Sequence, residues 1–540
     1  MAAPITLTPQ SERNHLRHYS PSPWGDFFLN HATCTDSITG KHFFYCMQLL
    51  SMKERAQIKE EEVRRMILEI AASSNLAQKL ELVDTLIGVD YHYKKEINDL
   101  LCSIYNDEDG GSDDLYITSL SIFIGSIPGA NQPLNANYAN FNLGHQINIQ
   151  GGNTGRVRGG ICKSVITQSK ADEVFEKFRD KQGNISSDDV SCLLMLYDAA
   201  NMRTHGEEIL DDMITFNKSR LQSLMLKNLE PELAEEKKVV QYGTILEFAK
   251  LDYNILQTIY CDELKELTVW WKDLHSRNDL SFARDRMVEM HFWTLGALYE
   301  PYYSYPRTIV TKFTLLASLL DDFYDNYCCT TEESTIFTTA IERWDERTTE
   351  EFPAHLKPLL ISILDTTNKI EEELKLQKNR HAEVVKKLVI CTAKFYHAEV
   401  NWRDEYYVPT TVDEHLKKSL RSIVCMQIII AVLISLRDGT TTREEDVNWA
   451  FSFPKLMRGV SAVGRVGNDI MSHELKVVIE EAWMDIVEEY LNQKRPMEFL
   501  EKSVDVARTM DFFYKRDDVY TLPLSIKDTI TSMYVNPCDL

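Results

Sequence analysis

The spacing of apolar residues along the chain predicts helices almost throughout. In one example, apolar residues repeat every three or four positions, as they do on one face of a helix: Ile309, Phe313, Leu316, Leu320 and Phe323. The apolar–polar alternation that predicts strands is scarce. Helix-ending prolines fall between the periodic blocks, as expected of connections in a helical bundle: Pro301, Pro306, Pro353, Pro358, Pro409 and Pro454. The pattern therefore predicts an all-α fold.

Residues 123–170 break this pattern. Eight of the 21 glycines and seven asparagines gather there, and the stretch contains no acidic residue. Composition alone favours a surface loop, although so long a structureless insertion is unusual in a compact domain. Its glycine-rich piece, residues 151–155, lacks the Lys-Ser/Thr ending of a phosphate loop and follows no clear strand. We assign it no nucleotide.

Composition narrows the class of protein. A chain of 540 residues has room for two or three domains, and 44% hydrophobic with 26% charged residues is typical of a globular protein. The net charge of -23 opposes broad electrostatic binding to nucleic acid or to an anionic membrane, and an anionic substrate would need help from cations. The apolar run at residues 43–50 is too short to span a bilayer, so we expect no membrane anchor. The 11 cysteines show no paired metal-ligand spacing, which favours reduced thiols and the cytoplasm.

An aspartate cluster follows the apolar run TLLASLL in the sequence DDFYD, which contains Asp321, Asp322 and Asp325. On a helix, the spacing i and i+4 puts Asp321 and Asp325 on one face. Carboxylates crowded together repel one another unless a cation neutralises them, and hard oxygen ligands suit Mg²⁺. The alternative is a solvated acidic helix end, which the preceding apolar run disfavours. The cluster predicts a metal-diphosphate site.

Two arginines upstream, Arg284 and Arg286, stand in SFARDRMVEMHFW on what we predict to be a separate helix. Guanidinium groups suit bidentate binding of phosphate oxygens, so this pair could hold a leaving diphosphate. The alternative is an ordinary surface pair bonded to Asp285 or Glu289. Together with the aspartates, the arginines favour the diphosphate interpretation.

A second group of oxygen ligands occurs in GRVGNDIMSHELK, where Asn468 and Ser472 are one helical turn apart, near Arg465 and Asp469. A polar helix surface is the alternative. Aromatic residues such as Phe292, Trp293, Tyr514 and Tyr520 are core residues by default, but aromatic faces also stabilise positive charge.

With these motifs in order along the chain, the sequence resembles plant terpene synthases, specifically cytosolic sesquiterpene synthases of the grass type, over nearly its whole length. DDFYD resembles the family's DDxxD motif, RDR its RxR motif, and NDIMSHELK its second metal-binding motif. The segments PSPWGDFF, HGEEIL, LEFAKLDYN and VWWKDL are also similar to family segments.

The resemblance implies two α-helical domains, an N-terminal one over residues 1–215, with 123–170 as an atypical insert, and a catalytic class I domain over residues 216–540. It implies three Mg²⁺ ions, with Mn²⁺ as an alternative, bound by Asp321, Asp322, Asp325, Asn468 and Ser472. It implies substrate binding by Arg284, Asp321, Arg465 and Asn468. It implies catalytic roles for Arg284, Arg286, Trp293, Asp518 and Tyr520, the last two in RDDVYTLP, where Val519 replaces the glycine of a family lid motif.

The resemblance also implies the reaction, in which metals and arginines assist departure of diphosphate and the carbocation becomes a terpene, a carbon–oxygen lyase chemistry of plant secondary metabolism. The DxDD motif of protonation-initiated cyclisation is missing, and so is the arginine pair usual before the N-terminal tryptophan of many plastid monoterpene synthases. We therefore expect farnesyl diphosphate as substrate, a sesquiterpene as product, and a monomer. A monoterpene synthase acting on geranyl diphosphate is the alternative.

The chain departs from the family at its second metal motif, whose form is (N/D)Dxx(S/T)xxxE. Lys476 stands at the position of the final glutamate, and Glu474 points roughly 120° away from the shared helix face. The sequence after Glu474 and the join at Lys237-Lys238 both skip segments that the family has. These departures suggest a variant transcript or an inaccurate gene model, and they keep open a catalytically silent or impaired variant. A chain-elongating prenyltransferase is a further rival, but it would use two aspartate-rich motifs and only one is present.

Overall fold

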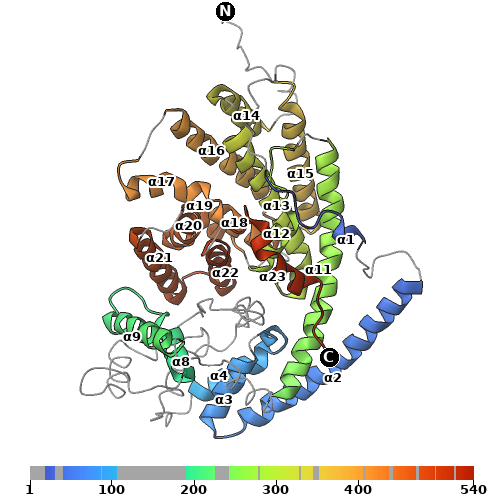
Figure 1. Ribbon diagram of the computed structural model, residues 1–540, viewed down its shortest axis with the longest axis vertical. Helices are drawn as coiled ribbons and strands as arrows, with labels where there is room; N and C mark the ends of the chain where they lie inside the picture. Colours follow the sequence, from blue (N-terminus) through green and yellow to red (C-terminus); the bar gives the residue numbers. More distant parts are fainter. Residues whose placement is uncertain are drawn as a thin grey trace, which may run out of the picture. The chain divides into compact units, whose positions relative to one another are not determined.

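The computed structural model describes residues 19–30, 40–86, 88–105, 190–225, 242–277, 280–327, 330–344, 352–405, 409–436, 442–469, 473–492, 494–515 and 518–540. Helices joined by turns and loops make up this part of the chain, and no strand occurs in it (Figure 1). The predicted all-α fold is therefore confirmed. The atypical stretch at 123–170 lies outside the described residues.

The chain forms two compact units that each draw on distant parts of the sequence. Unit 1 comprises Met1–Thr35, Ile259–Ile479 and Lys502–Ser532, and unit 2 comprises Asp36–Thr258, Glu480–Glu501 and Met533–Leu540. Four helices contribute residues to both units: α11 (Gly243–Arg277), α21 (His473–Asn492), α22 (Met497–Tyr514) and α23 (Lys527–Tyr534). The single boundary between residues 215 and 216 that the resemblance implies stays a prediction.

Unit 1 carries the predicted site residues. Its remaining elements are α1 (Phe27–Asn30), α12 (Met287–Leu295), the 3-10 turn η4 (Pro301–Tyr303), α13 (Ser304–Asp322), the π-helical turn η5 (Phe323–Tyr327), α14 (Thr331–Arg343), α15 (Lys357–Leu376), α16 (Val384–Asp404), α17 (Val412–Ser422), α18 (Cys425–Ser435), α19 (Glu444–Phe451), α20 (Lys455–Asn468) and the 3-10 turn η7 (Pro523–Ile526).

Helix α13 runs through the core of unit 1. It packs against α12, α15, α16 and α18. The predicted apolar stripe from Ile309 to Phe323 is buried at every one of its five positions. Each such side chain contributes roughly 1.5–3 kcal/mol of stabilisation relative to an exposed position. This burial fixes the helix end that carries the aspartates.

Helix α18 is mostly apolar, and all eleven of its residues are buried. The stretch Val412–Ser435 is apolar and long enough to cross a membrane by composition, but 78% of its apolar window is buried inside the protein. The chain also leaves helical geometry between α17 and α18, where Val424 has a left-handed φ of 66°. These features are typical of a core helix.

Several prolines lie at the starts of helices and not only in the connections between them. Pro301 begins η4, and Pro454 is the N-cap of α20. Pro306 and Pro358 lie inside the first turns of α13 and α15, which differs from the expectation that they fall between helices. The first turn of a helix tolerates proline because its N–H groups have no intrahelical acceptor.

A buried ionic network joins α11 to α13 within unit 1. The Arg307 guanidinium donates to both carboxylate oxygens of Glu263, from Nε and Nη2, each at 2.7 Å. His291 lies 2.8 Å from the same carboxylate. Burial disfavours the charged Glu263 carboxylate, but the Arg307 charge and its hydrogen bonds outweigh it and lower the pKa of Glu263 to about 2.

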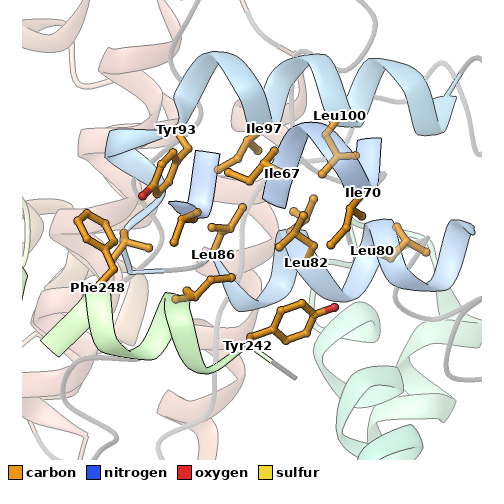
Figure 2. Close-up of a cluster of buried hydrophobic side chains, with 14 of the residues drawn as sticks. Ile67, Ile70, Leu80, Leu82, Leu86, Tyr93, Ile97, Leu100, Tyr242 and Phe248 are labelled. Atoms are coloured by element: carbon orange, nitrogen blue, oxygen red, sulfur yellow. The ribbon is translucent and has the colours of Figure 1, made fainter. Parts of the chain in front are cut away.

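Unit 2 contains α2 (Gly40–Ala71), α3 (Leu76–Thr85), the 3-10 turn η2 (Asp90–His92), α4 (Lys94–Tyr105), α8 (Val190–Ala200) and α9 (Glu208–Met225). Figure 2 shows its apolar core, in which side chains from α2, α3 and α4 meet those at the start of α11. The labelled residues are Ile67, Ile70, Leu80, Leu82, Leu86, Tyr93, Ile97, Leu100, Tyr242 and Phe248.

The C-terminal residues of the chain are hydrogen-bonded to α11 within unit 2. The Asn254 side chain donates to the Cys538 carbonyl at 3.0 Å and accepts from the Cys538 amide at 2.8 Å. Gln257, one turn away, donates to the Asn536 carbonyl at 2.9 Å. The last residues of the chain therefore satisfy polar groups on a helix far away in sequence.

Candidate active site

The aspartate cluster lies where α13 ends. The α-helix stops at Asp322, and the next five residues, Phe323–Tyr327, form a π-helical turn. Single π-turns are rare and occur often at functional sites. The spacing of the aspartates predicts an α-helix through Asp325, and the π-turn differs from this prediction, although Asp321 and Asp325 still interact electrostatically.

Asp322 points inward and is held by Arg284. Its side chain is 1% exposed and accepts the Arg284 backbone N–H at 2.7 Å. The Arg284 Nε lies 2.9 Å from its other oxygen. Burial raises the pKa of Asp322 to about 6, against the opposing effect of the Arg284 charge. This contact fixes the start of the RDR motif against the end of α13.

Asp321 and Asp325 are the more accessible carboxylates of the cluster. Asp321 is 31% exposed and accepts from Arg284 Nη2 at 2.6 Å. Part of the Asp325 residue is exposed to solvent, but its carboxyl group has lost much of its hydration. This loss, together with the negative charges of Asp321 and Glu399, raises the pKa of Asp325 to about 7. Negative charge is therefore in local excess, which is the condition that a hard cation relieves.

Glu399 on α16 joins this cluster and was missed by the sequence analysis. Its carboxylate accepts a hydrogen bond from the Ser422 hydroxyl and lies 3.5 Å from Arg465 Nη2. Burial raises the pKa of Glu399, and the charge of Asp321 adds to the effect. No spacing rule identifies Glu399, because it lies in an ordinary amphipathic stretch and reaches the site only through packing of α16 against α13.

Arg465 on α20 joins Glu399 to further polar groups. Its guanidinium donates to the Ser419 carbonyl at 3.1 Å, to the Ser422 hydroxyl at 3.0 Å and to Asp469 at 3.2 Å. Burial raises the pKa of the nearby Tyr396 hydroxyl, the charges of Asp321, Glu399 and Asp325 raise it further, and the charge of Arg465 opposes them.

The second metal motif is described only in part. Asn468 is the last residue of α20 and is half-buried, and the neighbouring Asp469 lies 2.9 Å from His415 Nε2. Ser472 lies outside the described residues, as does the side chain of Lys476. Their roles stay predictions.

Arg286 occupies a different position from Arg284. Its side chain is fully buried, and all five of its N–H groups donate to protein acceptors. Nε donates to the Tyr520 carbonyl at 2.9 Å, and Nη1 donates to the carbonyls of Ser20 at 2.9 Å and Asp285 at 2.8 Å. Nη2 donates to the Ser20 hydroxyl and the Thr521 carbonyl, both at 3.3 Å. Arg286 thus binds protein backbone, whereas the sequence suggested a diphosphate contact.

The predicted lid residues form a compact turn beside Arg284. One Asp518 carboxylate oxygen accepts the amides of Tyr520 and Thr521, each at 3.1 Å. The Tyr520 hydroxyl lies 2.5 Å from the Ser318 hydroxyl of α13, and the Arg284 guanidinium stacks 4.9 Å from the Tyr520 ring centroid. A valine at position 519 is therefore compatible with a turn here.

Trp293 lies on α12 and is buried, as are Phe292 and the nearby Glu289. The Glu289 carboxyl is fully buried, and neither of its oxygens has a hydrogen-bond partner of good geometry. Burial is the main cause that raises its pKa to about 7.

Comparison with known proteins places the chain in a family. The model described as "Terpene synthase family, metal binding domain" matches residues 272–510. The model described as "Terpene synthase, N-terminal domain" matches residues 23–124 and 171–242, so its match is interrupted over the stretch that the sequence analysis singled out.

Curated relatives are grass enzymes. The chain is 38% identical to an (E)-beta-caryophyllene synthase of Zea mays, covering 100% of this chain and 99% of the relative. It is 33% identical to a beta-sesquiphellandrene synthase of Sorghum bicolor, covering 96% of each chain. The caryophyllene synthase alignment spans 597 positions against the 540 residues here, so the relative has segments without a counterpart in this chain.

Solved structures share the fold. A limonene synthase with 2-fluorolinalyl diphosphate aligns with a TM-score of 0.77 at 21% identity, over 96% of this chain and 99% of that one. Isoprene synthase from Populus x canescens, in complex with three Mg²⁺ ions and dimethylallyl-S-thiolodiphosphate, aligns with a TM-score of 0.74 at 23% identity, over 91% and 98%. The family models and the full-length relatives agree with the motifs and the all-α fold, and the chain belongs to the terpene synthase family.

Proposed function

We propose that this chain converts farnesyl diphosphate to a sesquiterpene with release of diphosphate. The observation that carries the proposal is the meeting, within unit 1, of an excess of carboxylates at Asp321, Asp325 and Glu399 with the arginines Arg284 and Arg465. The relatives named as caryophyllene, farnesene, sesquiphellandrene and zingiberene synthases support a sesquiterpene product.

The carboxylates suit a divalent cation. Asp321 and Asp325 are accessible oxygen ligands, and the raised pKa of Asp325 reflects surroundings that disfavour a further negative charge unless a cation is present. We propose that Asp321 and Asp325, with Asn468 and Ser472, hold Mg²⁺, and that Asp322 chiefly fixes Arg284. Bound Mg²⁺ supplies charge stabilisation to the departing diphosphate.

The protein's own groups have distinct tasks in this proposal. The Arg284 and Arg465 guanidinium groups bind diphosphate oxygens and orient the leaving group. The buried face of α12 with Trp293 supplies an aromatic surface that favours a carbocation. The turn from Asp518 to Thr521 helps to exclude water from the cation.

The experiment is incubation of the purified chain with farnesyl diphosphate and MgCl₂, followed by gas chromatography and mass spectrometry of extracted volatiles. We expect a sesquiterpene whose formation is abolished in Asp321→Ala. Geranyl diphosphate in a parallel reaction tests the monoterpene alternative, and MnCl₂ tests the choice of metal. Absence of any terpene from a folded chain would refute the proposal.

A second proposal, an impaired variant, is favoured by Lys476 and by the segments that the longer relative has and this chain lacks. An ammonium group at the position of the final ligand opposes Mg²⁺ binding there. If Lys476→Glu produces terpene where the unmodified chain does not, the defect lies in the second metal motif.

We also propose that the protein is a monomer of the cytoplasm, as its resemblance to the cytosolic members of the family implies. Size-exclusion chromatography with light scattering tests the monomer. A fluorescent fusion expressed in plant cells tests the location, and plastid fluorescence would contradict it.

A further inference from the structure

Arg286 joins two segments that are far apart in the sequence. The Ser20 carbonyl and hydroxyl belong to the N-terminal segment, and the carbonyls of Tyr520 and Thr521 belong to the turn after α22. One guanidinium group, fully buried and with every N–H engaged, bridges them at the start of α12. Four of its five charge-assisted hydrogen bonds hold the two distant segments and the fifth goes to the adjacent Asp285 carbonyl, so the role of Arg286 is to position these segments.

The two joined segments present aromatic rings to Arg284. Tyr19 precedes Ser20, and its ring centroid lies 5.5 Å from the Arg284 guanidinium carbon. The ring of Tyr520 lies 4.9 Å from the same carbon. The Thr521 hydroxyl accepts from Arg284 Nη1 at 3.4 Å. Arg286 therefore binds the backbone of Ser20, Tyr520 and Thr521. The side chains of Tyr520, Thr521 and Tyr19, which adjoins Ser20, surround Arg284.

We propose that Arg286 is a positioning residue that fixes the orientation of the Arg284 guanidinium by holding its two aromatic neighbours. The two arginines of the RDR motif then have different roles. Arg284, which is 13% exposed and paired with Asp321, faces the ligand, whereas the buried Arg286 binds only protein. The consequence for diphosphate binding rests on the proposed function, whereas the bridge itself does not.

The geometry also predicts that lysine cannot replace Arg286. An ammonium group has three tetrahedrally arranged donors, whereas a guanidinium has five donors in one plane. Arg286→Lys keeps the charge and loses the simultaneous contact with both segments. Arg307→Lys is the matched control, because Arg307 is equally buried in unit 1 and its guanidinium binds Glu263 and the carbonyls of Leu298 and Glu300, which belong to neither segment.

The first test is hydrogen exchange by mass spectrometry on the metal-free, ligand-free protein. In Arg286→Lys we expect amides in peptides covering residues 19–30 and 518–526 to exchange about tenfold to a hundredfold faster, the factor expected when one or two net hydrogen-bond contributions are lost. Arg307→Lys should leave these peptides unchanged. Unchanged exchange of either segment in a folded Arg286→Lys protein would overturn the proposal.

A second, milder variant keeps the test decisive if Arg286→Lys fails to fold. Ser20→Ala removes one acceptor of Arg286 and leaves the backbone carbonyl, so it should accelerate exchange in residues 19–30 and leave residues 518–526 as in the unmodified chain. Equal acceleration of both segments would show that the N-terminal segment, and not Arg286, holds the turn.

The second test measures inorganic pyrophosphate binding in the presence of MgCl₂ by titration calorimetry. We expect Arg286→Lys and Tyr19→Leu each to weaken binding about tenfold, and the double variant to be scarcely weaker than either, because both act through the orientation of Arg284. Additive losses would mean that Arg286 and Tyr19 act independently and would overturn the proposal. If the unmodified chain binds no pyrophosphate, the proposed function fails, while hydrogen exchange still decides the bridge.

Discussion

The buried Glu289 carboxyl on α12 makes a quantitative prediction about stability and pH. It is fully buried, neither oxygen has a well-formed hydrogen bond, and burial raises its pKa from 4.5 to about 7. A pKa raised on folding means that the folded state favours the protonated carboxyl. The stability that this group contributes is therefore fully present below about pH 4.5 and is lost as the pH rises through about 7.

The size of the effect follows from the two pKa values. At about 1.4 kcal/mol per pH unit, ionising Glu289 in its buried site costs about 3 kcal/mol at pH 8 and above. Glu289→Gln has the shape of the neutral carboxyl and removes this cost. We expect the stability advantage of the variant over the unmodified chain to be about 2 kcal/mol larger at pH 8.5 than at pH 5.5.

The assay is urea denaturation followed by tryptophan fluorescence at pH 5.5, 7.0 and 8.5, with the exposed Glu332→Gln as control. Since every other titrating group is common to both proteins, the difference between them isolates Glu289. A difference that is the same at all three pH values would refute the reasoning, because it would mean that Glu289 has the same pKa in the folded and unfolded states.

Three further perturbations test the packing. Glu263→Gln leaves the Arg307 charge buried without its partner, so we expect a loss of about 3–5 kcal/mol in unfolding free energy, measured by urea denaturation. Gly296→Ala would place a methyl group 2.0 Å from Thr509 Oγ1, and we expect it to lower the free energy of unfolding by about 1–3 kcal/mol and the melting temperature with it. Adding Thr509→Ala should restore the melting temperature only in part, because the Cβ of residue 509 also lies close, at 2.9 Å. Asn254→Ala removes two hydrogen bonds to the C-terminal residues, and we expect faster hydrogen exchange and proteolysis there with the rest of the protein unchanged.

Much of the fold could be predicted because helical periodicity is a local signal. The stripe from Ile309 to Leu320 predicts the buried face of α13, and the order of the motifs along the chain indicates the family. The π-turn at Phe323–Tyr327 could not be predicted, since it depends on how the end of α13 packs and no spacing of residue types specifies it.

The candidate site was predictable only where function leaves a sequence motif. Asp321 and Arg284 stand in such motifs, and the structure brings them within 2.6 Å. Glu399 stands in none, because a single carboxylate on an amphipathic helix looks like any solvated position until tertiary packing is known. The contacts of Arg286 with Ser20 were equally hidden, since they join residues 266 positions apart.

The interleaved composition of the two units has a consequence for how the chain folds during its synthesis. Proteins generally fold domain by domain as the chain leaves the ribosome, beginning at the N-terminus. Here unit 2 needs Asn536 and Cys538 to satisfy polar groups on α11, and unit 1 needs Tyr520 and Thr521, which Arg286 joins to Ser20. Neither unit can complete its contacts before residues 502–540 have left the ribosome, so the helices made earlier stay partly assembled and accessible to chaperones until then.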